Sequence, residues 1–375
     1  HMQQCERAMF DLRRGVAIVI RDDNTTSDGE DHRLVFPVET GSPRSLRTLQ
    51  AEASGPSSLV LAAQRMRLLG EPEARDCGRL VLPAGSVDLE RCRRIACGAV
   101  SGAEHRSLER QAPDQADRAV VALLKRALLI PAALTAQIKP AAVRRLLDNR
   151  TALDVSVEEI DACLEHSAGR LRRVSEADVP LETAAKARFI LFREPDGLHE
   201  HVAVVVGDRD NWPDAVSVRL HSACLTGDLF GSLRCDCGEQ LRNGVARIAS
   251  AGGGVLLYLA QEGRGIGLAN KLRAYALQDA GADTVDADAA LGFSPDERRF
   301  RIAVEMLDQL GVGRVRLLTN NPRKVAALEA GGIEVTDREA VYGRLNEHNR
   351  RYLRAKADRS GHLLETWLGA ESETD

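Results

Sequence analysis

Short apolar runs alternate with helical segments from about residue 174 onward, and this alternation limits the possible folds more than any other feature. Strands are expected at residues 187–192, 201–207, 215–220, 254–260 and 315–319. A strand end followed by a helix is expected at residues 233–250. Helices are expected at residues 268–280, 299–310 and from Pro322, a residue that suits a first helical turn. Such alternation predicts an α/β or α+β domain with a mixed sheet flanked by helices.

The first part of the chain is rich in Ala, Leu, Arg and Asp, and we expect it to form a separate domain. Its apolar spacing predicts helices at residues 6–14, 58–69, 116–129 and 154–164, with Ser156 as the N-cap of the last. The change of texture places the boundary near residue 170 and gives two domains, 1–170 and 171–375. A length of 375 residues with 44% hydrophobic content suffices for two cores.

Charge and hydropathy narrow the class of protein. The net charge of -4 and the pI of about 6.2 lack the basic excess of dedicated nucleic-acid binders. No apolar run reaches the ~18 residues that indicate a membrane span, and we expect no secretory leader. We therefore expect a cytoplasmic protein with neither a nucleic acid nor a membrane as partner. Since disulfides are rare in that compartment, five scattered cysteines are interpreted as buried apolar residues or free thiols.

The other three cysteines, Cys224, Cys235 and Cys237, lie within fourteen residues in the pattern C-x10-C-x-C. Thiolates are soft ligands that suit zinc. Three protein ligands leave a fourth tetrahedral position for water, as in catalytic zinc sites, and Arg234 could help to keep the thiols deprotonated. The spacing alone leaves two alternatives open: three unrelated buried cysteines, or a structural zinc completed by His221.

Other candidate residues are less specific when each is considered alone. The loop 261–265 (QEGRG) between an expected strand and helix suits an anion, and Arg264 could bind a phosphate in bidentate fashion, but glycines also simply make turns. Tyr275 would be interpreted as a packed aromatic residue. Asp296 and Arg298, after Pro295, would be a charged first turn of the helix that continues through Arg299.

Six motifs occur in a fixed order through this part of the chain. They are residues 219–228 (RLHSACLTGD), 232–238 (SLRCDCG), 261–264 (QEGR), 271–278 (KLRAYALQ), 292–298 (GFSPDER) and 317–322 (LLTNNP). Together they resemble GTP cyclohydrolase II, the first enzyme of riboflavin biosynthesis, over roughly residues 174–368. The resemblance implies that GTP is hydrolysed to 2,5-diamino-6-ribosylamino-4(3H)-pyrimidinone 5′-phosphate, formate and pyrophosphate, and that the protein is a homodimer.

The resemblance also implies roles for the residues that match these motifs. Cys224, Cys235 and Cys237 would hold one Zn²⁺, which activates the water that attacks C8 of guanine. Tyr275 would assist ring opening, Asp296 would accept a proton, and Arg298 would attack the α-phosphorus to form a guanylyl intermediate. The residues expected to contact GTP are Arg219, Leu220, His221, Ser222, Ala223, Gln240, Glu262, Gly263, Arg264, Thr284, Thr319 and Lys324. Mg²⁺ is expected with the phosphates, and Ala223 departs from the family, which often has an acidic residue there.

Two other functions and the role of the first half remain open. The chain could be a homologue that stops at the formamidopyrimidine intermediate, or a non-catalytic GTP-binding regulator, although the presence of Tyr275, Asp296 and Arg298 argues against both. Residues 6–23 and 59–63 resemble the opening of 3,4-dihydroxy-2-butanone 4-phosphate synthase, but the acidic stretch 22–31 is not Glu-rich and later motifs are missing. We expect a degenerate or divergent domain without that activity; an unrelated accessory domain is the alternative.

Overall fold

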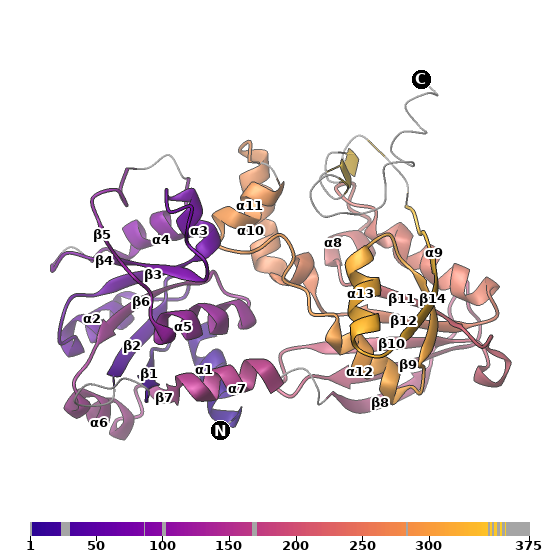
Figure 1. Ribbon diagram of the computed structural model, residues 1–375, viewed down its shortest axis with the longest axis horizontal. Coiled ribbons are helices and arrows are strands. Elements are labelled where there is room, and N and C mark those ends of the chain that lie inside the picture. The colour runs from indigo at the N-terminus through magenta and orange to yellow at the C-terminus, as the bar shows by residue number, and fades with distance from the viewer. Residues whose placement is uncertain are drawn as a thin grey trace. The chain divides into compact units, whose positions relative to one another are not determined.

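The chain forms two compact units in the computed structural model. The structure describes residues 2–23, 31–85, 87–99, 103–166, 171–282 and 284–343, and six further residues up to 357. The first unit comprises His1–His166 together with Ala269–Glu297, and the second comprises Ser167–Leu268 together with Arg298–Asp375 (Figure 1). Each unit contains a mixed sheet with helices, which confirms the expected fold class. The segment 269–297, which the sequence analysis placed in the second domain, groups with the first unit.

The first unit is built on a seven-stranded sheet in the order β5-β4-β3-β6-β2-β1-β7. Among the described strands of this sheet, only β1 and β7 pair in parallel. The strands are β1 (Ile18–Asp22), β2 (Asp31–Pro37), β3 (Ser58–Ala62), β4 (Cys77–Val81), β5 (Glu109–Gln111), β6 (Ala132–Gln137) and β7 (Leu153–Ser156). The helices are α1 (Met2–Arg13), α2 (Pro43–Glu52), α3 (Ala63–Leu68), α4 (Leu89–Cys97), α5 (Gln115–Arg126), α6 (Pro140–Asp148), α7 (Val157–His166), α10 (Leu268–Asp279) and α11 (Thr284–Ala290).

The expected helix at residues 58–69 is wrong in its first half, because residues 58–62 form β3 and only Ala63–Leu68 is helical. A short, wholly apolar run fits a buried strand as well as a helix, and here pairing with β4 and β6 on both sides makes it a strand. The expected cap of α7 is confirmed. Ser156 Oγ accepts a hydrogen bond from the Glu159 N–H (3.1 Å), and the Ser156 N–H donates to Glu159 Oε2 (2.9 Å).

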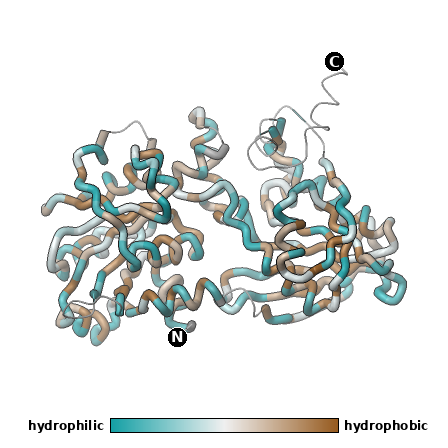
Figure 2. Tube along the Cα trace, in the orientation of Figure 1, coloured by the Kyte–Doolittle hydropathy of each residue, from teal (hydrophilic) through white to brown (hydrophobic). Residues whose placement is uncertain are grey.

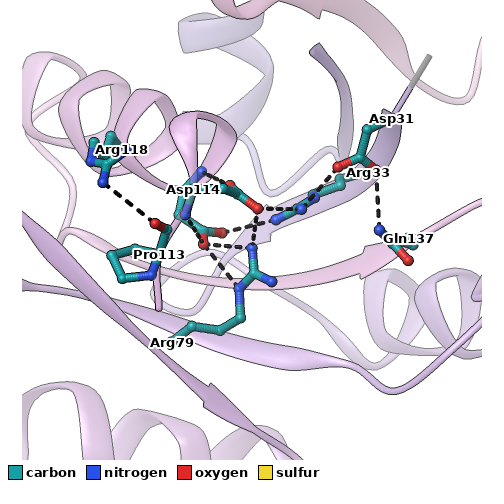
Figure 3. Close-up of polar contacts among 8 residues, drawn as sticks. Asp31, Arg33, Arg79, Pro113, Asp114, Arg118 and Gln137 are labelled. Atoms are coloured by element: carbon teal, nitrogen blue, oxygen red, sulfur yellow. Dashed lines mark hydrogen bonds and ion pairs between the residues drawn. The ribbon is translucent and has the colours of Figure 1, made fainter. Parts of the chain in front are cut away.

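A buried ionic cluster joins the sheet of the first unit to the N-terminus of α5 (Figure 3). Arg33 on β2 donates to Asp117 (3.2 Å) and also pairs with Asp114, while Arg79 on β4 donates to Asp117 (2.6 Å) and Asp114 (2.5 Å). Burial, together with the charge of Asp114, raises the pKa of the Asp117 carboxyl. Removal of one partner would leave a buried charge uncompensated, so the cluster holds α5 firmly on the sheet.

The second unit is a seven-stranded sheet in the order β14-β13-β11-β12-β10-β9-β8. Its strands are β8 (Arg172–Asp178), β9 (Ala187–Arg193), β10 (Glu200–Val206), β11 (Val216–Ser222), β12 (Gly254–Leu259), β13 (Arg314–Leu318) and β14 (Glu334–Glu339). Its helices are α8 (Leu225–Asp228), α9 (Cys237–Ser250), α12 (Arg301–Gln309) and α13 (Pro322–Ala330). Apolar stretches occur along the strands of both units (Figure 2). Within the described residues, no helix has the length and apolar character needed to cross a membrane.

Candidate metal and phosphate site

The predicted site residues of the second unit gather at the carboxyl ends of three parallel strands. β11 pairs in parallel with both β12 and β13, so their carboxyl ends meet at one edge of the sheet. This edge is where α/β sheets commonly bind ligands. Cys224 follows the end of β11, the loop 261–267 follows β12, and Thr319 follows β13. The topology therefore brings together motifs that are separated by up to about a hundred residues of sequence.

The three clustered cysteines form a group that could hold a metal ion. Cys224 precedes α8, Cys237 begins α9, and the three Sγ atoms lie within 4.8 Å of one another. None of the three forms a disulfide. The Sγ atoms of Cys224 and Cys235 are 3.7 Å apart, close to the ~3.8 Å expected for two sulfurs that each lie ~2.3 Å from a tetrahedral zinc. The donor set and its spacing thus fit zinc.

Gly227 allows α8 to approach the sulfurs this closely. A Cβ at residue 227 would lie 2.6 Å from Cys235 Sγ and 3.1 Å from Cys224 Sγ. Any side chain there would therefore enter the space between the thiols. The observed arrangement of the thiols therefore requires a residue without a side chain at this position.

The Asp228 carboxylate supports the cysteine segment, residues 224–237, through three hydrogen bonds. Its carboxylate accepts hydrogen bonds from the Cys224 N–H (3.0 Å), the Tyr258 hydroxyl (2.8 Å) and His221 Nε2 (3.0 Å). The His221 and Tyr258 rings stack, with centroids 5.6 Å apart. Burial lowers the pKa of His221 although Asp228 opposes it, and burial raises the pKa of Tyr258. Among the described residues, the metal-ligand group formed by the three cysteines does not include His221, so the alternative of His221 as a fourth ligand finds no support here.

A buried arginine holds the side chain of Gln240 in place. Arg219 is 5% exposed and donates to the Leu318 carbonyl (3.2 Å) and to Gln240 Oε1 (2.9 Å). Gln240 Nε2 in turn donates to Asp236 Oδ2 (2.5 Å). Burial lowers the pKa of Arg219 to about 10, which leaves it charged at neutral pH. The amide of Gln240 is thus held on both sides.

The glycine-rich loop is connected directly to the cysteine segment. Gly263 and Arg264 both have left-handed backbone conformations, with φ of 62° and 60°, and this is uncommon for a residue with a side chain. Glu262 Oε2 accepts from the Leu225 N–H (2.7 Å), the first amide of α8. The Glu262 carboxylate therefore joins the loop to the metal segment.

A second buried carboxylate, Glu194, supports the other side of this loop. Glu194 is 2% exposed and accepts from His201 Nε2 (2.9 Å) and from Arg299 Nη2 (2.9 Å). His201 Nδ1 accepts from the Ala260 N–H (3.0 Å), which places the proton of the neutral ring on Nε2. Gln261 Nε2 donates to the Arg299 carbonyl (2.7 Å). These contacts fix the start of the loop relative to the residues that precede α12.

Two positive charges lie near the same aromatic ring. The Arg298 guanidinium is 5.1 Å, and Lys324 Nζ 5.9 Å, from the centroid of Phe300. Lys324 Nζ also donates to the Leu220 carbonyl (2.6 Å), at the end of β11. Thr319 Oγ1 accepts from the Asn321 N–H (3.0 Å) at the start of α13. This pair of cations at the strand ends suits an anion.

Three predicted residues, Tyr275, Thr284 and Asp296, belong to the first unit instead. Lys271 Nζ lies 5.7 Å from the centroid of the Tyr275 ring, and Thr284 begins α11, with a side chain outside the described part. The expected helical turn at Asp296 is wrong, because α12 begins at Arg301. The Glu297 carboxylate turns back to accept the Ser294 N–H (2.8 Å), which stabilises a local turn in place of a helix.

Sequence reasoning assigned no role to Asp228, Tyr258, Glu194 or His201. Asp228 ends the motif RLHSACLTGD, so its position was visible, but its contacts with Tyr258 and with the Cys224 amide were not. Glu194 and Arg299 are 105 residues apart in the chain. No local pattern indicates a pair of that separation.

Known proteins similar to this chain agree with one another. Residues 172–340 match the family model described as GTP cyclohydrolase II. The chain is 42% identical to the GTP cyclohydrolase-2 of Azospirillum brasilense, over 97% of this chain and 94% of that one. It is 55% identical to the GTP cyclohydrolase-2 of Azotobacter vinelandii (strain DJ / ATCC BAA-1303) over 175 residues, 47% of this chain and 84% of that one.

A solved structure also matches most of the chain. It is a two-domain 3,4-dihydroxy-2-butanone 4-phosphate synthase from A. baumannii, with 17% sequence identity over 91% of this chain and 99% of that chain. The TM-score is 0.34. The faint resemblance of residues 6–23 to that enzyme therefore stays a prediction.

Proposed function

The chain belongs to the GTP cyclohydrolase II family, and from this premise we propose a zinc-dependent hydrolysis of GTP. The products would be 2,5-diamino-6-ribosylamino-4(3H)-pyrimidinone 5′-phosphate, formate and pyrophosphate, in the first step of riboflavin biosynthesis. The observation that carries the proposal is the group of three thiols, with a sulfur–sulfur distance of 3.7 Å, at the same sheet edge as two cations. That arrangement supports the proposal of a metal site beside an anion site.

Cys224, Cys235 and Cys237 would hold the zinc. When bound, zinc supplies Lewis acidity and lowers the pKa of a coordinated water to near ~7. Asp228 accepts the backbone N–H of Cys224 and so holds that ligand in place. Such outer contacts tune metal affinity strongly.

The phosphates of GTP would bind to the cations at the strand ends and to the loop 261–267. Arg298 and Lys324 would supply charge, and the left-handed conformations of Gly263 and Arg264 shape a loop whose backbone N–H groups would bind an anion. Thr319 lies at the start of α13, where a helix N-terminus favours an anion. Mg²⁺ would arrive with the phosphates, which supply most of its ligands.

The guanine ring would lie near the end of β11, beside residues 219–223. Arg219 and Asp236 hold the Gln240 amide in a fixed orientation, which suits recognition of a base edge. His221 donates its Nε2 proton to Asp228 if the ring is neutral, so Nδ1 is the acceptor. Leu220 and Ser222 complete this strand end, and the small Ala223 follows it.

Tyr275, Asp296 and Arg298 would also take part in the reaction. By family resemblance Tyr275 assists ring opening and Asp296 accepts a proton. Arg298 would contact the α-phosphate; its role as a nucleophile is chemically demanding because a guanidinium stays protonated in proteins. A mass-spectrometric search for a guanylyl adduct on Arg298 tests that role directly.

The decisive experiment measures zinc, pyrophosphate and formate on one preparation given GTP and Mg²⁺. We expect one zinc per chain and equal amounts of formate and pyrophosphate. Pyrophosphate without formate would favour the homologue that stops at the formamidopyrimidine, and GTP binding without any turnover would favour the regulator. Tyr275→Phe should slow formate release more than pyrophosphate release, and equal slowing of both would remove Tyr275 from the ring-opening step.

For the first half we propose that 3,4-dihydroxy-2-butanone 4-phosphate synthase activity is absent. The acidic stretch at residues 22–31 lacks the Glu-rich pattern of that enzyme, which binds magnesium there. Incubation of the protein with ribulose 5-phosphate and Mg²⁺ should give no butanone phosphate. Formation of that product would overturn this part of the proposal.

A further inference from the structure

The segment Ala269–Glu297 lies inside the family match by sequence but is built into the first unit by its contacts. We propose that the first half of the chain is a scaffold that holds this segment, and with it Tyr275, in its working position. This inference rests on the proposed role of Tyr275. It gives the first half a function that needs no activity of its own.

A buried arginine attaches the middle of the segment. Arg65 on α3 is 2% exposed and donates to the carbonyls of Ile95 (2.7 Å) and Gly98 (2.9 Å), at the end of α4. It also donates to the carbonyl of Ala290 (3.1 Å), the last residue of α11. Helix C-termini carry partial negative charge, so one buried cation stabilises both helix ends and joins them. Burial lowers the pKa of Arg65 to about 10, which leaves it charged at neutral pH.

Two polar side chains of α10 attach the start of the segment. Asn270 is fully buried and donates to the carbonyl of Leu128 (3.1 Å), a residue with a left-handed backbone at φ 60°. Arg273 donates to Asn270 Oδ1 (2.7 Å) and to Glu39 Oε1 (2.8 Å). Glu39 Oε2 accepts from the Ile130 N–H (2.7 Å). The loop after α5 is thus shaped to receive α10.

The end of the segment is attached by an ion pair and by close packing. Lys125 Nζ on α5 donates to Glu297 Oε1 (2.8 Å). Gly292 has a left-handed backbone at φ 89°, and a Cβ there would lie 2.9 Å from Pro131 Cγ and 3.4 Å from Ala62 Cβ. Start, middle and end of the segment are therefore each held by residues of the first half.

These contacts determine where Tyr275 lies within the first unit. Tyr275 is on α10, two residues after Arg273 and five after Asn270, so the helix carries it rigidly with those two anchors. The Azotobacter vinelandii relative has 84% of its length in a 175-residue match, which leaves no room for a half like residues 1–166. That relative must hold its equivalent of the segment by other contacts, so the support proposed here is particular to chains that carry the first half.

The test uses two single variants of the full-length protein. Lys125→Met removes the ion pair to Glu297, and Glu39→Gln removes the negative charge that faces Arg273. Hydrogen–deuterium exchange should rise several-fold in α10 and α11. The kcat for formate release should fall about tenfold, less than the ~100-fold that a 1 Å misplacement can cost. Zinc content and KM for GTP should stay unchanged, and Lys125→Arg should restore kcat. These variants are milder than loss of Arg65, which could unfold the unit.

The matched control is Arg21→Met. It removes the ion pair of Arg21 with Asp154 (2.7 Å), whose side chains are both 28% exposed, compared with 22% for Lys125 and Glu297. This pair lies in the same unit and joins β1 to β7, so exchange in α10 and kcat should match wild type. The scaffold role is overturned if exchange in α10 does not rise in Lys125→Met, if it rises without loss of kcat, or if Arg21→Met has the same effect. Wild-type protein that does not turn over GTP would refute the proposed function, while the exchange data would still test the docking.

Discussion

Replacement of Gly227 by alanine should destroy the metal site while leaving the fold intact. The new Cβ would lie 2.6 Å from Cys235 Sγ, 3.0 Å from Cys237 Cβ and 3.1 Å from Cys224 Sγ. Gly227 has no left-handed backbone, so alanine meets a steric obstacle and no conformational one. The collision is therefore confined to the thiol cluster.

The size of the required movement determines the expected loss. Ordinary van der Waals contact begins at 3.4 Å, so Cys235 Sγ or α8 would have to move by about 0.8 Å. Metal–ligand distances tolerate only ~0.2 Å. A movement roughly four times larger should lower zinc affinity by at least the ~10–100-fold seen when outer contacts of a metal site are lost.

The assay is competition with a zinc chelator, followed by formate release from GTP. The matched control is Gly313→Ala, since a Cβ at residue 313 has nothing within 4 Å and the residue lies in the same unit. We expect Gly227→Ala to bind less than one zinc per chain and to release no formate, with an unchanged circular dichroism spectrum. Unchanged zinc affinity in Gly227→Ala would show that the sulfurs do not converge on one metal as inferred here.

Three further predictions concern the carboxylates. Asp228→Asn replaces one carboxylate oxygen by an amide nitrogen. That nitrogen cannot accept the hydrogen bonds of the Cys224 N–H and the Tyr258 hydroxyl, so zinc affinity should fall ~10-fold by chelator competition. Glu194→Gln should lower the free energy of urea unfolding by ~2–3 kcal/mol, less than for a fully buried pair because Arg299 is 32% exposed. Burial alone would raise the pKa of Glu297, but its contacts with Lys125 lower it below 4.5. The contacts of the Glu297 carboxylate therefore stabilise the folded unit fully above pH 4.5, and this stabilisation is lost as the pH falls further. Hydrogen exchange in α11 should rise only below pH 4.5.

The central strands of the second unit were predictable because they are buried and apolar. Strands β9 to β13 each contain a short apolar run, and each was expected within a few residues of its observed bounds. β8 and β14 were missed because they are edge strands, in which most residues are exposed and no apolar pattern arises. Local hydropathy indicates which residues are buried, so it detects buried strands and misses exposed ones.

The candidate site was predictable where its chemistry is concentrated in short motifs. The three cysteines lie within fourteen residues, and their convergence is observed. The supporting contacts of Glu194 were not predictable, because they join β10, the end of β12 and the residues before α12. Such contacts depend on strand order, which no single segment of sequence records.

The proposed metal binding and the proposed support of the segment 269–297 depend on different parts of the chain. The thiols, Gly227 and Asp228 all lie within residues 224–237, in the second unit, so zinc affinity should not respond to changes in the first half. Tyr275 is held by contacts of α10 with the first half, so steps that need it should respond. The motifs along the chain indicate the family, whereas the compact units show which part of the chain holds each segment in place. Residues 269–297 belong to the family match by sequence but to the first unit by their contacts. Changes near Glu39 or Lys125 should therefore alter formate release without altering zinc content.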